Sequence, residues 1–452
     1  MSSPLPFATE LVNLVIDQLC DSPADLKACA LTSRDWVSQS RLHLFNHIHL
    51  YQNNVDPFLT LCASPYSTLP LARIRSLCIA TNLMVDGESE DKKLQNCPAF
   101  DQLLTWQSSD GKSVANTVFR NLQRLELDWI GWHTLSKAAR LILYSGFQNV
   151  TELKMWNTVF ESGDEYLEFV TSLIALEQLW LDGVVIRAPI QGLRSLNLPV
   201  SLHTLSIQNI CSRLAPVIRI MTPCPTLKNF SGHVCNFQDM TVDCAEAVGA
   251  LLASTGPCLE EFAFRVQAAG MLKEGMDLDA SLQYIDLTKN TSLRSITLDI
   301  DDDSYLEPFL QRLTYSAHSP TLERLNVPFL LSSSLSPSID PTRIDRIMQN
   351  PYFSRLHEFR CRVCVIFGLE DVEGQPEGWY ERPNDGSQPI KDMESRIQEL
   401  RSKMPNLAER RVLQVDEYFR FASWQLWGRS TRRRTSSDSE SGEGHQSESD
   451  SE

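Results

Sequence analysis

The feature that most constrains how this chain can fold is a short apolar phrase that recurs along most of its length. In each full copy, an apolar residue is followed by two variable residues, a second apolar residue, one variable residue and a third apolar residue. The clear copies begin at Phe45, Ile74, Leu122, Val150, Leu176, Leu202, Leu227, Leu259, Leu293, Leu322 and Leu356. Because they recur about every 30 residues, they indicate a repeat architecture in which each unit packs mainly against its neighbours. A weaker copy covers Leu407–Val412.

Segments with helical patterns lie between these phrases, at residues 133–146, 163–175, 242–255, 341–350 and 391–403. A short strand followed by a helix leaves one apolar face on each unit, and stacking of the units buries that face. The pattern resembles the leucine-rich repeats and covers residues 44–415. The resemblance implies an α/β solenoid with parallel strands inside and helices outside. The Asn that is usual three residues after the last apolar residue is replaced in most copies, as at Ile130 and Val184.

The first 44 residues precede the repeats and have the pattern of three helices. Residues 10–19 place apolar side chains at helical spacing. Ser22 and Pro23 are typical of the cap and the first position of a second helix, and a third helix is predicted from Arg34 to Leu44. A hairpin of this size cannot bury its own apolar side chains well. We therefore expect these helices to pack on the repeats or on another protein.

This segment resembles the F-box, a module of three helices. Leu5-Pro6, Glu10-Leu11, Asp25-Leu26 and Leu31–Trp36 stand where the family has its Leu-Pro, acid-Leu, Asp-Leu and Trp-containing phrases. An F-box joined to leucine-rich repeats is a known family architecture that is numerous in fungi. In that family the F-box binds a Skp-type adaptor. The residues that the resemblance assigns to this contact are Leu5, Pro6, Leu11, Val15, Ile16, Leu19, Leu26, Leu31 and Trp36.

The resemblance implies that the chain is the substrate-recognition subunit of an SCF-type cullin-RING ubiquitin ligase. The adaptor would connect the chain to the ligase, and the repeats would hold a protein substrate for ubiquitin-dependent degradation. Such a subunit acts by proximity, so we expect it to have no enzymatic activity, no catalytic residue and no cofactor. Two alternatives stay open. In the first, the chain is a leucine-rich-repeat scaffold outside any ubiquitin ligase. In the second, residues 5–44 only cap the open end of the repeats.

Side chains between and just after the last two apolar residues of each phrase should face the concave side of the solenoid. Among them, the expected substrate contacts are Trp156, Trp180, Asp128, Asp182, Arg265, Arg360 and Arg362. The two tryptophans fall on neighbouring strands, where exposed aromatic side chains would anchor an interface. The acids come early along this surface and the arginines late. This order fits a substrate with a complementary charge gradient, and a solvated charged face is the alternative.

The composition narrows the choice of partners and compartment. The formal net charge of −16 disfavours nucleic acid as a partner, because binding phosphates needs clustered Lys and Arg. The N-terminus lacks the basic region of a signal peptide, and no apolar stretch reaches the length of a membrane span. We therefore expect an intracellular protein of the cytoplasm or nucleus, with no membrane partner. The twelve cysteines are scattered, as expected for reduced thiols that pack like small apolar residues.

None of the metal-binding or catalytic motifs that we considered is complete. Cys361 and Cys364 have the CxxC spacing but lack a second ligand pair, so zinc is not expected. Asp299–Asp303 is followed by Ser304 where a calcium loop needs Gly. The sequence contains neither an HExxH motif nor a nucleophile elbow. Binding of another protein is therefore the function class that the sequence favours.

The predicted domains are an F-box over residues 1–44 and a leucine-rich-repeat domain over residues 45–415, with a long loop at about 368–390. Residues 416–452 form a C-terminal segment that should be disordered from about 430, because only acids follow Arg434 among the charged residues. The Ser-acid spacing of this tail suits acidophilic kinases. The run Arg432–Arg434 suits a basophilic kinase or nuclear import, and a solvated tail is the alternative.

Overall fold

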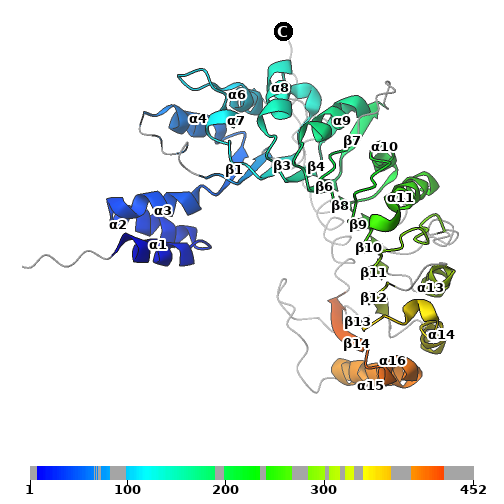
Figure 1. Ribbon diagram of the computed structural model, residues 1–452. Helices are drawn as coiled ribbons and strands as arrows, with labels where there is room; N and C mark the ends of the chain where they lie inside the picture. The colour runs from blue at the N-terminus through cyan, green and yellow to red at the C-terminus, as the bar shows by residue number, and fades with distance from the viewer. Residues whose placement is uncertain are drawn as a thin grey trace, which may run out of the picture.

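The structure, a computed structural model, describes residues 8–65, 67, 69, 73–81, 98–188, 198–234, 241–266, 283–300, 305–315, 321–329, 340–367 and 388–421. Its main body is an arc of stacked repeats, with strands along the inner side and helices along the outer side (Figure 1). Three further helices project from the N-terminal end of this arc (Figure 1). The protein therefore offers two different surfaces, one on the arc and one on the projecting helices.

One parallel sheet of twelve strands forms the inner side of the arc. Its strands are β1 (His47–Tyr51), β2 (Ser76–Ala80), β3 (Arg124–Asp128), β4 (Glu152–Trp156), β6 (Gln178–Asp182), β8 (Thr204–Gln208), β9 (Asn229–Val234), β10 (Glu261–Val266), β11 (Ser295–Ile300), β12 (Arg324–Phe329), β13 (Glu358–Phe367) and β14 (Leu413–Phe421). They lie side by side in chain order, and every neighbouring pair is parallel. Two short strands, β5 (Val159–Ser162) and β7 (Val185–Ala188), pair in a separate sheet.

Helices connect successive strands along the outer side of the arc. They are α4 (Val55–Ala63), α6 (Pro98–Thr105), α7 (Val114–Thr117), α8 (Lys137–Gly146), α9 (Gly163–Ser172), α10 (Ala215–Ile220), α11 (Val242–Thr255), α13 (Leu306–Thr314), α14 (Pro341–Ile347), α15 (Gln388–Lys403) and α16 (Pro405–Glu409). Short 3₁₀ turns lie among them: η2 (Trp132–Thr134), η3 (Ser212–Leu214), η5 (Gly256–Cys258) and η6 (Pro351–Phe353).

The apolar phrases become strands because they bury alternate side chains against the helices. In β3, Leu125 and Leu127 are buried, and the residues on either side of each are partly exposed. Such residues from all the repeats join one core that extends from Ile48 to Val412. Because each repeat completes the core of the next, we expect none of them to be stable alone.

A residue in the left-handed backbone region follows directly after four of the strands and turns the chain out of the sheet. These residues are Trp129, Asn157, Gly183 and Asn209, with φ between 47° and 61°. Asn and Gly adopt such φ values with little strain, whereas a bulky Trp rarely does. The next positions, where leucine-rich repeats usually have Asn, are buried and hold Ile130, Thr158, Val184 and Ile210. Backbone bonds between repeats hold the turns instead, such as the 2.7 Å bond from the Asn157 N–H to the Asp182 carbonyl.

The three projecting helices form a small unit of their own. They are α1 (Thr9–Gln18), α2 (Pro23–Thr32) and α3 (Arg34–Leu44). Ile16 and Leu26 are buried inside this unit. The Asp17 carboxylate on α1 accepts a hydrogen bond of 2.5 Å from Gln39 and lies 2.7 Å from the His43 ring on α3. These two partners lower the pKa of Asp17.

The α/β solenoid predicted from the repeats is confirmed. Each of the eleven clear phrases supplies one strand of the sheet, and the weaker phrase at Leu407–Val412 leads into β14. The sheet continues beyond residue 415, because β14 runs to Phe421. The repeat pattern did not predict β5 and β7. Leu5, Pro6, residues 368–387 of the predicted loop and the tail from residue 422 lie outside the described residues.

Candidate functional site

The helices α1 and α2 carry an unusual amount of exposed apolar surface. Leu11, Leu14 and Val15 are 53, 59 and 61% exposed, and Leu31 at the end of α2 is 88% exposed. The three α1 residues lie on one face of the helix, because positions three and four apart are neighbours on a helix surface. We call these four residues the exposed apolar set. Exposed apolar side chains on neighbouring helices mark a candidate interaction surface.

The predicted adaptor contacts divide into inner and outer residues. Leu11, Val15 and Leu31 are exposed and belong to the set above. Ile16 and Leu26 are 0 and 1% exposed, so in this arrangement they pack the unit and do not reach a partner. Leu19 and Trp36 are half-buried, and Leu5 and Pro6 lie outside the described residues.

Leu14 was missed in the sequence, although its position could have indicated it. It lies three residues after Leu11 and directly before Val15, so all three share the outer face of α1. The predicted contacts on α1 combine Leu11 and Val15 of this outer face with Ile16, which packs inward. Amphipathic periodicity locates both faces of a helix, but it does not say which one a small domain buries.

The projecting unit does not complete the core of the solenoid. That core begins at Ile48, and neither Ile16 nor Leu26 belongs to it. In Figure 1 the three helices stand apart from the strands and outer helices of the arc. A cap on the open end would bury its apolar residues against the first repeat. The exposed apolar set is therefore left uncovered by the described part of the chain.

The second candidate surface lies on the concave face of the sheet. The strand register places Asp128 of β3, Trp156 of β4 and Asp182 of β6 side by side. Adjacent strands are about 4.8 Å apart, so each carboxylate flanks the indole of Trp156. Trp156 is 37% exposed, and both aspartates are half-buried. We call these three residues the acidic strip.

The second predicted tryptophan is less available than the first. The ammonium of Lys154 lies 5.5 Å from the centre of the Trp180 ring, which makes a cation–π contact within the protein. The same ammonium is 3.4 Å from Glu126 and 3.4 Å from Glu152. Trp180 is half-buried, and its Nε1 is buried without a hydrogen-bond partner among the described residues. Trp156 is therefore the more exposed of the two tryptophans, and contact of either with a substrate stays a prediction.

The carboxylate of Asp128 is held in an unfavourable environment. Burial, together with the nearby carboxylates of Asp182 and Glu126, raises the pKa of Asp128 to about 6. No hydrogen bond or ion pair joins its side chain to another described residue. A cation placed beside Asp128 would relieve both the desolvation and the repulsion between carboxylates.

The basic half of the concave face is already neutralised from within the sheet. Arg265 forms an ion pair of 2.7 Å with Asp299. Arg360 forms one of 2.9 Å with Glu358 and donates to Gln414 at 3.2 Å. The side chain of Arg362 lies outside the described residues. The predicted charge gradient along the concave face is thus weaker than the sequence indicates. The acidic strip lies at the acidic end of this gradient, and its carboxylates form no ion pair with another described residue.

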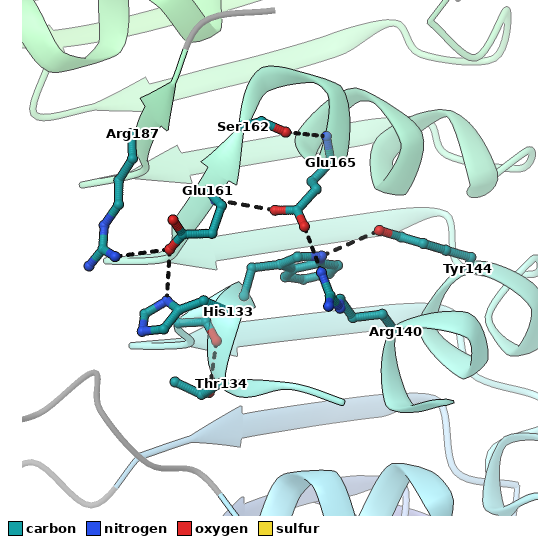
Figure 2. Close-up of polar contacts among 10 residues, drawn as sticks. His133, Thr134, Arg140, Tyr144, Glu161, Ser162, Glu165 and Arg187 are labelled. Atoms are coloured by element: carbon teal, nitrogen blue, oxygen red, sulfur yellow. Dashed lines mark hydrogen bonds and ion pairs between the residues drawn. The ribbon is translucent and has the colours of Figure 1, made fainter. Parts of the chain in front are cut away.

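Polar side chains where β5 and β7 meet the outer helices form ion pairs and hydrogen bonds with one another. Figure 2 shows Glu161 between Arg187 at 2.9 Å and His133 at 3.1 Å. It also shows Glu165 accepting a 2.6 Å bond from Arg140, while the N–H of Glu161 donates to Glu165 at 3.2 Å. These contacts join η2, α8, α9 and both short strands. We assign this network to bracing of adjacent repeats.

Three further findings concern the thiols, the metal-binding groups and the helices of the described residues. Burial raises the pKa of the thiols of Cys62, Cys78 and Cys244 to about 12, so they are poor nucleophiles at neutral pH. No group of three or more His, Cys, Asp or Glu side chains suited to a metal ion lies in this part of the chain. Among the described helices, none has the length and apolar character needed to cross a membrane.

Comparison with known proteins gives a limited result. No family model matches the chain, and no curated protein matches it. Among solved structures, a leucine-rich-repeat protein of Leptospira interrogans matches with 12% sequence identity and a TM-score of 0.22. The match covers 88% of this chain and 98% of that chain. A superposition this loose says nothing about function, and the fold class rests on the parallel sheet and its outer helices.

Proposed function

We propose that this protein is the substrate-recognition subunit of an SCF-type cullin-RING ubiquitin ligase. Helices α1–α3 bind a Skp-type adaptor, and the concave face of the solenoid binds the protein substrate. The chain contributes proximity alone, because holding both partners raises the effective concentration of substrate lysines near the conjugating enzyme.

The single observation that carries this proposal is the exposed apolar set on α1 and α2. Leu11, Leu14, Val15 and Leu31 are more than half exposed in the lone chain, although the solenoid has an extensive core of its own. Burying a leucine side chain contributes about 1.5–3 kcal/mol, so four such residues can provide much of a stable interface. A partner that covers this set supplies the burial that the chain itself does not.

The concave face supports the substrate half of the proposal. Strands β3, β4 and β6 carry four acids and two bases, and the acidic strip has an exposed indole between two carboxylates. This combination suits an arginine or lysine of the substrate, whose cation would lie against Trp156 between Asp128 and Asp182. The substrate half therefore implies a basic segment in the protein that is recognised.

The test is the affinity of the purified chain for a purified Skp-type adaptor, measured by isothermal titration calorimetry. Leu11→Asp should weaken binding by at least about tenfold, because it places a charge in an apolar interface. Leu141→Asp is the matched control, since Leu141 is 54% exposed, also lies on a helix, and belongs to the outer side of the arc. Leu31→Asp repeats the test on α2.

The outcomes separate the two function classes. Loss of binding in Leu11→Asp and Leu31→Asp, with wild-type affinity in Leu141→Asp, supports the ligase role. No measurable binding of the wild-type chain, or equal affinities for all four proteins, contradicts it and favours a repeat scaffold outside any ligase. Circular dichroism and urea unfolding of each variant establish that the fold is unchanged.

A further inference from the structure

A cleft lies at the edge of the sheet where β2, β3 and β4 begin. Its volume is about 650 Å³, and it is lined by Arg73, Arg75, Arg120, Asn121, Gln123 and Asn149. We call it the arginine cleft. It belongs to neither surface described above, because its residues precede the strands and none of them lies on the concave face of the sheet.

The lining has the chemistry of an anion site. Three arginines and three residues with carboxamide side chains line this space, and no described lining residue carries a carboxylate. Arg73, Arg75 and Arg120 form no ion pair or side-chain hydrogen bond with the described residues. In a chain with a net charge of −16, three such arginines in one cleft are unexpected for a merely solvated surface.

Two pairs of positions further along the same edge have partners in a neighbouring repeat. Arg75 is the residue directly before its strand, and the corresponding residues of later repeats include Glu177, His203, Lys228 and Glu260. Lys228 lies 3.2 Å from the Glu260 carboxylate, and His203 lies 3.8 Å from that of Glu177. The side chains directly before β6, β8, β9 and β10 are therefore paired with side chains of neighbouring repeats. Where β2 and β3 begin, Arg75 has Gln123 beside it instead of an acid.

The backbone around the cleft is fixed before any ligand binds. The carbonyl of Arg75 accepts bonds of 2.8 Å from the N–H groups of Gln123 and Arg124, which continues the ladder between repeats. The Asn149 side chain donates to the Arg120 carbonyl at 3.3 Å, which links the segment before β4 to the segment before β3. Only the side chains need to be ordered on binding, so the backbone adds little to the conformational cost.

We propose that the arginine cleft binds a phosphate monoester. Guanidinium groups form paired, charge-assisted hydrogen bonds with phosphate oxygens, and the carboxamides can donate to the remaining oxygens. A phosphate monoester carries a charge of about −1.5 to −2 at neutral pH, so it balances most of the three arginines, whereas one carboxylate leaves two of them uncompensated. The cleft is much larger than one phosphate group, so it also has room for the residues that flank a phosphorylated side chain.

The test uses the full chain and a fluorescein-labelled peptide, Gly-Gly-phosphoserine-Gly-Gly, with binding measured by fluorescence anisotropy at pH 7.5. The Gly flanks have no side chains, so the phosphoserine provides the only side chain of the peptide. Arg75→Gln and Arg120→Gln should each reduce the affinity by about tenfold, since each removes a charge-assisted contact. Arg294→Gln is the matched control, because Arg294 is also exposed and directly precedes its strand, β11, outside the cleft.

Competition identifies the source of the phosphate group. Unlabelled phosphopeptide and inorganic phosphate are each added to displace the labelled peptide. If inorganic phosphate needs a much higher concentration than the phosphopeptide, the site recognises a phosphorylated side chain. If both displace it equally, the site holds phosphate itself, and the proposed chemistry still stands. Equal binding of the peptide with Glu in place of phosphoserine, or equal loss of affinity in Arg294→Gln, overturns the proposal. These outcomes are independent of adaptor binding, so failure here is distinguishable from failure of the proposed function.

Discussion

The environment of Asp128 leads to an unusual prediction, that removing its charge stabilises the folded protein. Above its pKa of about 6, Asp128 is ionised beside Asp182 and Glu126 in a half-buried position. In the unfolded chain the same carboxyl titrates near 3.8. A group whose folded pKa is raised binds its proton more tightly in the folded state, so its ionisation costs stability as the pH rises from about 4 to 6. Asp128→Asn removes that cost and keeps nearly the same shape.

The magnitude follows from the size of the pKa change. A rise from 3.8 to about 6 corresponds to about 3 kcal/mol at 1.36 kcal/mol per unit. Because the group is partly exposed to solvent, screening reduces this to about 1–2 kcal/mol. Asp128→Asn should therefore raise the free energy of unfolding by about 1–2 kcal/mol at pH 7.5. At pH 4, where the wild-type carboxyl is protonated when folded and about 40% protonated when unfolded, the difference should be much smaller.

Urea unfolding at both pH values, followed by tryptophan fluorescence, measures this difference. Glu168→Gln is the control, because Glu168 is exposed on α9, on the outer side of the arc, and its removal should change stability little at either pH. The reasoning is refuted if Asp128→Asn is no more stable than wild type at pH 7.5, or if its advantage is as large at pH 4.

Three further predictions concern the solenoid and its thiols. Asn290→Ala should lower the free energy of unfolding in urea by about 2–4 kcal/mol, because the buried Asn290 amide donates to three acceptors that lose their partner. Asp345→Ala should speed hydrogen exchange across 405–421, since this buried carboxylate accepts the N–H of Leu407 at 3.0 Å and holds α16 in place. N-ethylmaleimide at pH 7.5 should modify the exposed Cys20 and Cys258 before the buried cysteines, as mass spectrometry of the native protein will show.

The repeat pattern predicted the architecture because each strand phrase must bury the same apolar positions. Leu125 and Leu127 of β3 have their counterparts in Leu153 and Met155 of β4, and the register pairs them directly. The apolar pattern is kept although the usual Asn is replaced, because the apolar Ile130 packs at the position where that Asn would form hydrogen bonds. The short strands β5 and β7 could not be predicted in this way, because they do not recur in the other repeats.

Candidate sites were harder to predict because exposure depends on contacts between repeats. The sequence places Trp156 just after its strand phrase and Trp180 between the last two apolar residues of the next phrase, but it does not show that the register sets Lys154 over the Trp180 ring. Likewise, the sequence shows Arg265 as a cation on the concave face, whereas Asp299 on the next strand neutralises it. Such pairings follow from strand register across about 30 residues of chain, which local patterns do not specify.

The most direct measurement is the mass of the complex that forms when the chain is co-expressed with a Skp-type adaptor and purified through the adaptor. Size-exclusion chromatography with light scattering should give one copy of each protein. The same experiment without residues 1–44 should yield no complex, while the repeats stay folded by circular dichroism. A chain that never co-purifies with the adaptor, or one that still binds it without α1–α3, would contradict the assignment of those helices as the adaptor-binding unit.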